Sequence, residues 1–170
     1  MRLVSYGPES SRRCGIQVGD TVYDASAVAQ AAGLALDYQS TDWSKTKEVI
    51  ASDDRALRLL ETIAKGIQES RINDGMPLAL NNVRLGPPIP DPEKIICLGL
   101  NYRDYAKEAN LPLPQAPMLF AKFRNSLIGP FDDIELPYAN EKVDYEAELA
   151  VGPNTSVSGT RCSAFSVLWP

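Results

Sequence analysis

Apolar residues recur at helical spacing between positions 52 and 70. They fall at every third or fourth position, which places them along one stripe of a helix. The stripe consists of Ala56, Leu59, Leu60, Ile63 and Ile67. Ser52 or Asp53 stands directly before it, where a side-chain oxygen can accept a hydrogen bond from a free amide of the first turn. The pattern therefore predicts an amphipathic helix that turns its apolar stripe towards a core.

Shorter apolar runs near the N-terminus predict strands. "RLVSY" is typical of one strand, and "RCGIQVGDTVYDAS" of a hairpin that turns at residues 18–20. A short helix is expected through "AVAQAAG", capped by Asp24 or Ser26 and ended by Gly33. Strands and helices in this order predict a small N-terminal α/β domain over residues 1–86.

Prolines mark the change to a second part of the chain. Four of them stand between positions 87 and 92, in "PPIPDPEK", which predicts a linker. Next, "KIICLGL" predicts a buried strand over residues 94–98, with Cys97 in the core. We expect a domain over residues 87–151 that opens with this strand, followed by a divergent tail over residues 152–170.

A helix is expected after the strand, over residues 102–109, because "NLPLP" stops it. Further strands are expected over Met118–Lys122 and near Ile134. Polar side chains at the start of a helix often line a site. A plain connection between strand and helix is the alternative interpretation.

Composition and charge narrow the possible functions. Hydrophobic residues make up 44% of the 170 residues, as in globular proteins, and the net charge of −5 argues against a nucleic-acid partner. The first residues carry too short an apolar run for a signal peptide, and no stretch reaches membrane-spanning length, so a cytoplasmic or mitochondrial-matrix location is expected. Three widely spaced cysteines suit reduced thiols. No histidine is present, which removes the commonest acid/base catalyst at neutral pH.

Acidic residues alternate in "KVDYEAELAV", at positions 142–151. Asp144, Glu146 and Glu148 stand at every second position, so in a strand all three share one face. A solvated strand face is one interpretation of this pattern. A site that binds a cation is the other.

Several of these segments together resemble a known family. "KIICLGLNYRDYAKEANLPLPQAPMLFAKFRNSLIGP", followed by "VDYEAELAV", is similar to the fumarylacetoacetate hydrolase family, in particular to its smaller domain-containing members. The resemblance covers residues 89–151, and more loosely the part before them. It implies an α+β fold, in which a small N-terminal domain precedes the first part of a mixed β-roll. It also implies a Mg²⁺ or Mn²⁺ cofactor, a homodimer and a small-molecule oxo-acid substrate such as an acylpyruvate or oxaloacetate. The family's reactions include hydrolysis, decarboxylation and tautomerisation.

The resemblance assigns roles to residues. The family's metal-binding Glu-x-Glu pair falls on Glu146 and Glu148, with Asp144 as an adjacent polar residue, and Mg²⁺ prefers such carboxylate oxygens. The family's catalytic glutamate falls on Glu108, and its lysine, which holds the oxo-acid, on Lys122.

Tyr105 stands where the family has a histidine. The ordinary pKa of a tyrosine lies about 3.5 units above that of a histidine, so Tyr105 is a poor general base. It can still donate a hydrogen bond or a proton. The replacement of histidine by tyrosine therefore impairs a tautomerase less than a hydrolase.

Residues 152–170 contain no acidic residue, although the family supplies a third carboxylate ligand beyond its Glu-x-Glu pair. Two hypotheses follow from the sequence. The chain is a shortened or altered form of a metal-dependent enzyme of this family, weakened by these changes, or it is a non-catalytic relative, which is either an inactive product or a binding or dimerisation module.

Overall fold

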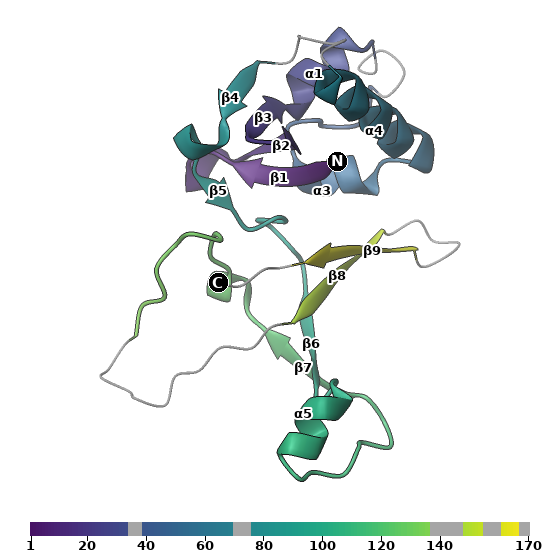
Figure 1. Ribbon diagram of the computed structural model, residues 1–170, viewed down its shortest axis with the longest axis vertical. Helices are drawn as coiled ribbons and strands as arrows, with labels where there is room; N and C mark the ends of the chain where they lie inside the picture. Colours follow the sequence, from purple (N-terminus) through teal and green to yellow (C-terminus); the bar gives the residue numbers. More distant parts are fainter. Residues whose placement is uncertain (34–38, 70–75, 137–147, 155–160, 167–170) are drawn as a thin grey trace. The chain divides into compact units, whose positions relative to one another are not determined.

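The computed structural model describes residues 1–33, 39–69, 76–136, 148–154 and 161–166 (Figure 1). The fold is α+β, as predicted. The chain forms two compact units. The first consists of residues 1–90 together with residues 128–170, and the second of residues 91–127. The domain boundaries expected at residues 86 and 151 stay predictions.

A five-stranded antiparallel sheet forms the frame of the first unit. Its strands are β1 (Arg2–Tyr6), β2 (Arg13–Val18), β3 (Thr21–Asp24), β4 (Pro77–Ala79) and β5 (Leu85–Gly86), in the order β4-β3-β2-β1-β5. The predicted hairpin between β2 and β3 is confirmed, and it turns at Gly19 with a φ of +57°. Sequence analysis identified β1, β2 and β3, but not the short strands β4 and β5.

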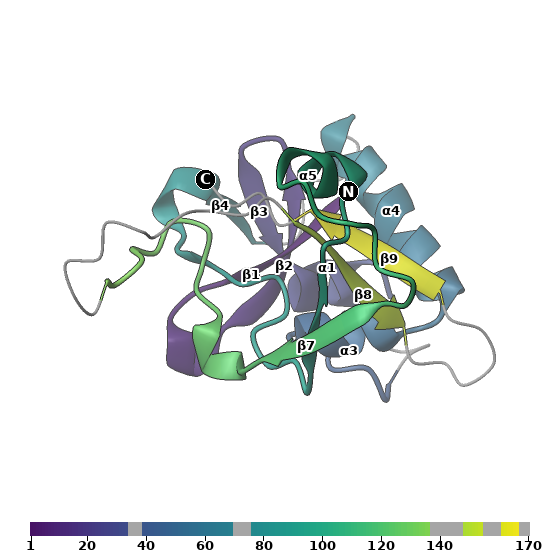
Figure 2. The same cartoon turned by 90° about the horizontal axis from the view of Figure 1, so that it is seen from below.

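Helices α1 (Ala25–Ala31), α3 (Thr46–Ala51) and α4 (Asp54–Gln68) pack in the same unit, and α4 runs along one side of β1 and β2 (Figures 1 and 2). Both predicted caps are confirmed. Asp24 accepts a hydrogen bond of 3.0 Å from Ala27 N, and Asp53 one of 2.8 Å from Ala56 N. The helix α3 was not predicted, because its six residues show no clear period.

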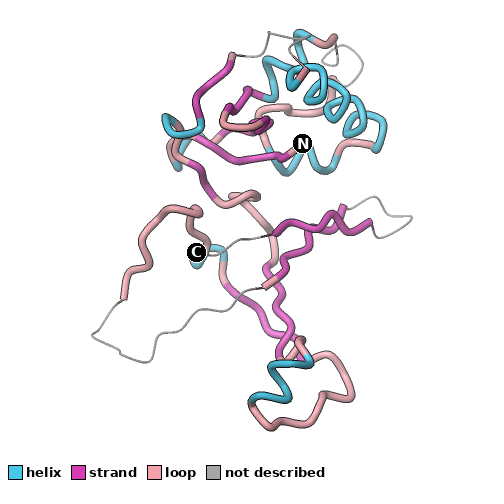
Figure 3. Tube along the Cα trace, in the orientation of Figure 1, coloured by secondary structure: helices cyan, strands magenta, loops and turns pink. Residues whose placement is uncertain are grey.

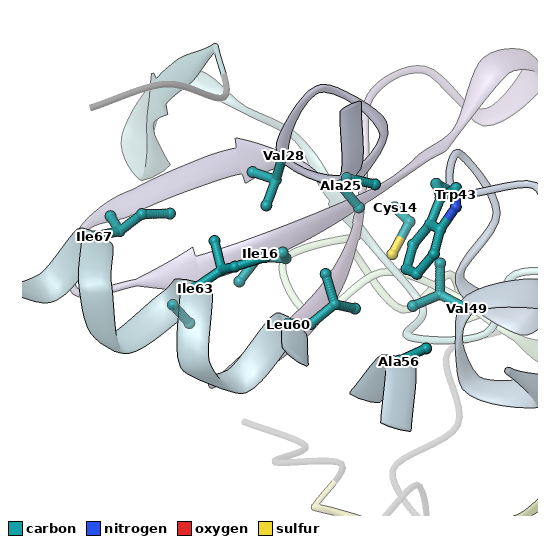
Figure 4. Close-up of a cluster of buried hydrophobic side chains, with 12 residues drawn as sticks. Cys14, Ile16, Ala25, Val28, Trp43, Val49, Ala56, Leu60, Ile63 and Ile67 are labelled. Carbon is teal, nitrogen blue, oxygen red and sulfur yellow. The ribbon is translucent and has the colours of Figure 1, made fainter. Parts of the chain in front are cut away.

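The hydrophobic core lies between the sheet and these helices. Figure 4 shows side chains of α4 directed towards Ile16 of β2 and Val28 of α1. The predicted stripe of α4 is buried at four positions, and Leu59 packs partly buried beside them. The cluster consists of Cys14, Ile16, Ala25, Val28, Ala29, Trp43, Val49, Ala56, Leu60, Ile63, Ala64 and Ile67. Burial of apolar area at this single core is therefore the main source of stability of the first unit.

The second unit is a hairpin with one helix. It contains β6 (Ile95–Gly99), α5 (Arg103–Glu108) and β7 (Met118–Lys122), close to the predicted bounds (Figure 3). The expectation that the first strand is buried was wrong. Ile96 is 63% exposed and Cys97 only half-buried. The reason is that, among the residues that the structure describes, β6 pairs with β7 alone, and Ala106 is the one buried hydrophobic side chain of residues 91–127.

A further hairpin pairs β8 (Leu149–Asn154) with β9 (Arg161–Ser166). The strand expected near Ile134 was wrong, since residues 133–136 have no regular structure. Single-turn 3-10 helices complete the described segments, at Glu9–Ser11, Leu80–Asn82 and Arg124–Ser126. In the described segments, no helix has the length and apolar character needed to cross a membrane.

Candidate functional site

The connection from β6 to α5 has an unusual backbone. Leu100 follows β6 directly and has a φ of +52°, a region that bulky side chains rarely adopt. Asn110, just after α5, has a φ of +52° as well, which is common for an asparagine that ends a helix. An unusual backbone such as that of Leu100 often occurs at functional sites, so the segment that begins at Leu100 is the first candidate for one. Nothing in the sequence signals the conformation of Leu100, because leucine has no preference for it.

Two of the predicted site residues lie on α5. Tyr105 and Glu108 are three residues apart, which places them on one face of the helix. Both are exposed, and Tyr105 keeps 55% of its surface accessible. Ala106 anchors the helix between them, because its side chain is buried and its carbonyl accepts a hydrogen bond of 2.9 Å from Leu111 N. The structure therefore exposes a phenol and a carboxylate on one face of α5.

Lys122 lies at the other end of the hairpin. It pairs with Ile95 at the start of β6, whereas Gly99, from which the chain leads into α5, pairs with Met118. The four residue steps from Ile95 to Gly99 correspond to about 13 Å along the strand. Within residues 91–127, the structure records no hydrogen bond or ion pair between Lys122 and α5. The roles that the resemblance assigns to Lys122 and Glu108 stay predictions.

Of the predicted acidic ligands, Glu148 is described. It stands directly before β8 and is exposed. Asp144 and Glu146 lie outside the described residues. Among the residues that the structure describes, no group of three or more acidic, cysteine or histidine side chains is arranged to hold a metal ion. The paired arrangement of Glu146 and Glu148 stays a prediction.

The buried cysteine is not a nucleophile. Cys14 is completely buried in the core, and this burial raises the pKa of its thiol to about 12. The thiolate form is the reactive one, so Cys14 is inert at neutral pH. Its role is to fill space between the sheet and the helices.

The family comparison points to the second half of the chain. Residues 94–166 match the family model described as the C-terminal part of fumarylacetoacetate hydrolase. All five of the predicted site residues lie within this range.

Similar curated proteins carry more specific names. The mitochondrial oxaloacetate tautomerase fahd2 of Xenopus laevis is 49% identical over 73 residues, which are 43% of this chain and 23% of the frog protein. The human mitochondrial oxaloacetate tautomerase FAHD2A is 47% identical over 64 residues, which are 38% of this chain and 20% of the human protein.

A longer match covers the first half of the chain as well. The fumarylacetoacetate hydrolase domain-containing protein 2 homolog of Dictyostelium discoideum is 34% identical over 159 residues, which are 89% of this chain and 45% of that protein. The chain therefore spans less than half the length of the curated relatives it matches.

A solved structure supports the fold. The crystal structure of an HpcE-like protein from Mycobacterium smegmatis aligns with a TM-score of 0.51 and 26% sequence identity. The alignment covers 81% of this chain and 41% of that chain.

Proposed function

Because the chain belongs to the fumarylacetoacetate hydrolase family, we propose that it acts on a small 2-oxo acid and that its reaction is the keto–enol tautomerisation of oxaloacetate. The observation that carries this proposal is the sequence identity of 47–49% to proteins named oxaloacetate tautomerases. The mitochondrial names of these relatives also favour the mitochondrial matrix as the location.

The side chains on α5 suit a tautomerase. Tautomerisation moves one proton between the carbon next to a carbonyl group and the carbonyl oxygen, and no water molecule is activated. Glu108 is a carboxylate that can accept the proton from carbon, while the Tyr105 hydroxyl can donate to the oxygen. Their shared helix face supports this division of roles, since one ligand can reach both groups.

The role that we assign to Lys122 is to bind a negatively charged carboxylate of the substrate. A lysine ammonium is a compact cation that pairs with carboxylates, and oxaloacetate carries two of them. We assign Lys122 to the carboxylate that lies farther from Tyr105.

The role that we assign to Glu146 and Glu148 is to bind Mg²⁺ or Mn²⁺. Both are carboxylates, which are the oxygen ligands that these ions prefer, so the residue types fit the metal. When bound, such an ion polarises a carbonyl group and stabilises negative charge that develops on its oxygen.

Tautomerisation of oxaloacetate can be followed by the loss of enol absorbance, with the spontaneous rate subtracted. We expect the chain to accelerate the reaction in the presence of Mg²⁺. Glu108→Gln should lower the rate by about 10²-fold or more, because it removes a positioned base. Glu135→Gln, at another exposed glutamate, is the matched control and should leave the rate unchanged. Equal rates for the two variants would contradict the role of Glu108.

A binding or dimerisation module is the second candidate function, and one observation favours it. One face of the β6–β7 hairpin carries Ile96, Leu98 and Leu119, which are 63%, 42% and 66% exposed. Contiguous exposed apolar surface of this kind marks contact sites between proteins. A second copy of the chain is the proposed occupant, in line with the expected homodimer.

Sedimentation equilibrium tests this candidate. Leu119→Lys should convert a dimer to a monomer, because a buried ammonium without a partner is costly. Leu113→Lys is the matched control, since Leu113 is exposed in the loop between α5 and β7. A wild-type chain that is monomeric at all concentrations would exclude a function as a dimerisation module.

A further inference from the structure

Residues 91–127 are joined to the first unit by two connections, and these lie side by side. The outgoing connection passes through Arg84, Leu85 and Gly86, and the returning one through Gly129 and Asp132. Gly129 is buried, and a Cβ added to it would lie 2.5 Å from the main-chain oxygen of Leu85. The two backbones are therefore in contact, and a glycine is required where they meet.

An ion pair spans the two connections. Asp132 Oδ1 accepts hydrogen bonds from Arg84 Nη2 at 2.8 Å and from Arg84 Nε at 3.2 Å. The other carboxylate oxygen, Oδ2, accepts from Gly129 N at 2.7 Å. Asp132 N also donates to Gly129 O at 3.2 Å, so the returning turn is closed by its own backbone as well. The carboxylate thus binds both connections at once.

The outgoing connection is fixed to the sheet. Gly7 N, next to β1, donates to Arg84 O at 2.9 Å, and β5 pairs with Ser5 and Tyr6 of β1. The Arg12 guanidinium lies directly against Gly86, so a side chain at this position would displace it. Arg84 is therefore held by the five-stranded sheet, and Asp132 ties the returning chain to it.

This pair differs from an ordinary surface ion pair. Exposed pairs contribute little, because solvent screens them and two long side chains must be ordered. Here the Asp132 side chain is only 20% exposed and has three donors, although Arg84 is 63% exposed. The partners are also 48 residues apart in sequence, so the pair closes a long loop.

We propose that Arg84 and Asp132 form a clasp that holds the two ends of residues 91–127 together and so acts as a pair of positioning residues for the segment that bears Tyr105, Glu108 and Lys122. The clasp lies outside the candidate site, and none of its contacts involves a substrate or metal. It stands even if the proposed tautomerase function fails, because the readouts below need no ligand.

Hydrogen exchange of the whole 170-residue chain tests the clasp. Arg84→Gln, Asp132→Asn and the double variant are compared with Asp133→Asn, which changes the exposed neighbouring carboxylate. Each single variant should speed exchange of the β6 and β7 amides by about tenfold, the order expected for one lost hydrogen-bonded contact. The double variant should add nothing further, because the two residues act through each other. The amides of β1, β2 and β3 and the Asp133→Asn control should match the wild type.

Two further measurements test whether Arg84 and Asp132 act together as a clasp or Asp132 acts only on its own turn. They are the exchange of a conservative variant and the pKa of Asp132. Arg84→Lys keeps the charge without the two-pronged contact and should give intermediate exchange. In the wild type the pKa of Asp132 lies below its ordinary value, first because of the hydrogen bond from Arg84 and then because of that from Gly129 N. The pKa of Asp132, followed by NMR, should rise in Arg84→Gln.

Three outcomes would overturn the proposal. Arg84→Gln could exchange like the wild type while Asp132→Asn affects only the turn at Gly129, which would make Asp132 a local cap. Exchange could rise equally in β1–β3, which would indicate general destabilisation. The pKa of Asp132 could stay unchanged in Arg84→Gln, which would show that the ion pair does not form in solution.

Discussion

The Tyr6 hydroxyl donates a hydrogen bond of 2.6 Å to Asp24 Oδ2, across the strand that separates them. Gly15 of this middle strand makes the approach possible, because a Cβ there would lie 3.0 Å from the Tyr6 ring and closer still to Val22. Arg13 donates to both Asp24 oxygens, at 2.7 and 3.1 Å. One carboxylate thus joins three strands to the first turn of α1.

Removal of the Tyr6 hydroxyl should lower the stability of the first unit. We expect Tyr6→Phe to reduce the free energy of unfolding by about 1.5–3 kcal/mol, since the hydrogen bond goes to a charged group that is buried. Tyr23→Phe, at a half-buried tyrosine of β3, is the matched control and should cost less than about 0.5 kcal/mol. Urea unfolding monitored by circular dichroism gives both values. Equal losses would contradict a special role for the Tyr6–Asp24 bond.

Alkaline pH should destabilise the same unit. Burial, together with the hydrogen bond to Asp24, raises the pKa of Tyr6 from 10.0 to about 12, and burial raises the pKa of Cys14 from 9.0 to about 12. Both groups are favoured in the neutral form when folded. Their contribution to stability is therefore complete below pH 9 and is lost as the pH rises from 9 towards 12. Unfolding free energies measured across this range should fall, and Tyr6→Phe should flatten the part above pH 10.

Substitutions of two adjacent leucines of α4 should lower the free energy of unfolding by different amounts. Leu60 is completely buried in the cluster, whereas Leu59 packs only at its edge. Leu60→Ala should cost about 3 kcal/mol in the free energy of unfolding, because it leaves a cavity, and Leu59→Ala clearly less. Thermal and urea unfolding of the two variants check this order. The reverse order would mean that α4 faces the sheet through a different stripe.

Local signals account for the elements that the sequence predicted. The stripe and cap of α4, the turn at Gly19 and the breaker after α5 each depend on residues a few positions apart. Strand β5 could not be predicted in this way, since its two residues are a strand only because they pair with β1, far away in the chain. The contact of Arg84 with Asp132 is likewise a product of the fold.

The sequence predicted the burial of side chains less well than it predicted the positions of helices and strands. The apolar run around Cys97 is typical of a buried strand, but in the described part of the chain β6 pairs with β7 alone, and Ile96 is exposed. For the candidate site, the sequence identified residue types and the pairing of Tyr105 with Glu108 on one helix. Any approach of Lys122, Glu146 and Glu148 to these two residues depends on long-range packing, which short motifs do not encode.

The presence of tyrosine instead of histidine at position 105 should lower the rate of hydrolysis more than the rate of tautomerisation. Tyr105→His alone should leave acylpyruvate cleavage by the 170-residue chain near background, because this position is 55% exposed and a base there is not enclosed with its substrate. When the chain is joined to the part of the Dictyostelium relative that the match does not cover, the same substitution should raise cleavage by about 10²–10⁴-fold. Full recovery by Tyr105→His in the 170-residue chain would contradict this prediction.

The most direct test of the proposed metal-dependent function is the melting temperature of the chain with and without Mg²⁺ or Mn²⁺, compared with that of the Glu146→Gln/Glu148→Gln variant. An ion that binds only the folded state must stabilise it, by about 2.7 kcal/mol when its concentration is 100-fold above the dissociation constant. We predict that the metal raises the melting temperature of the wild type and of an Asp133→Asn/Glu135→Gln control, but not that of the Glu146→Gln/Glu148→Gln variant. No rise in the wild type at millimolar metal, or an equal rise in all three proteins, would contradict the proposal that these two glutamates bind the metal.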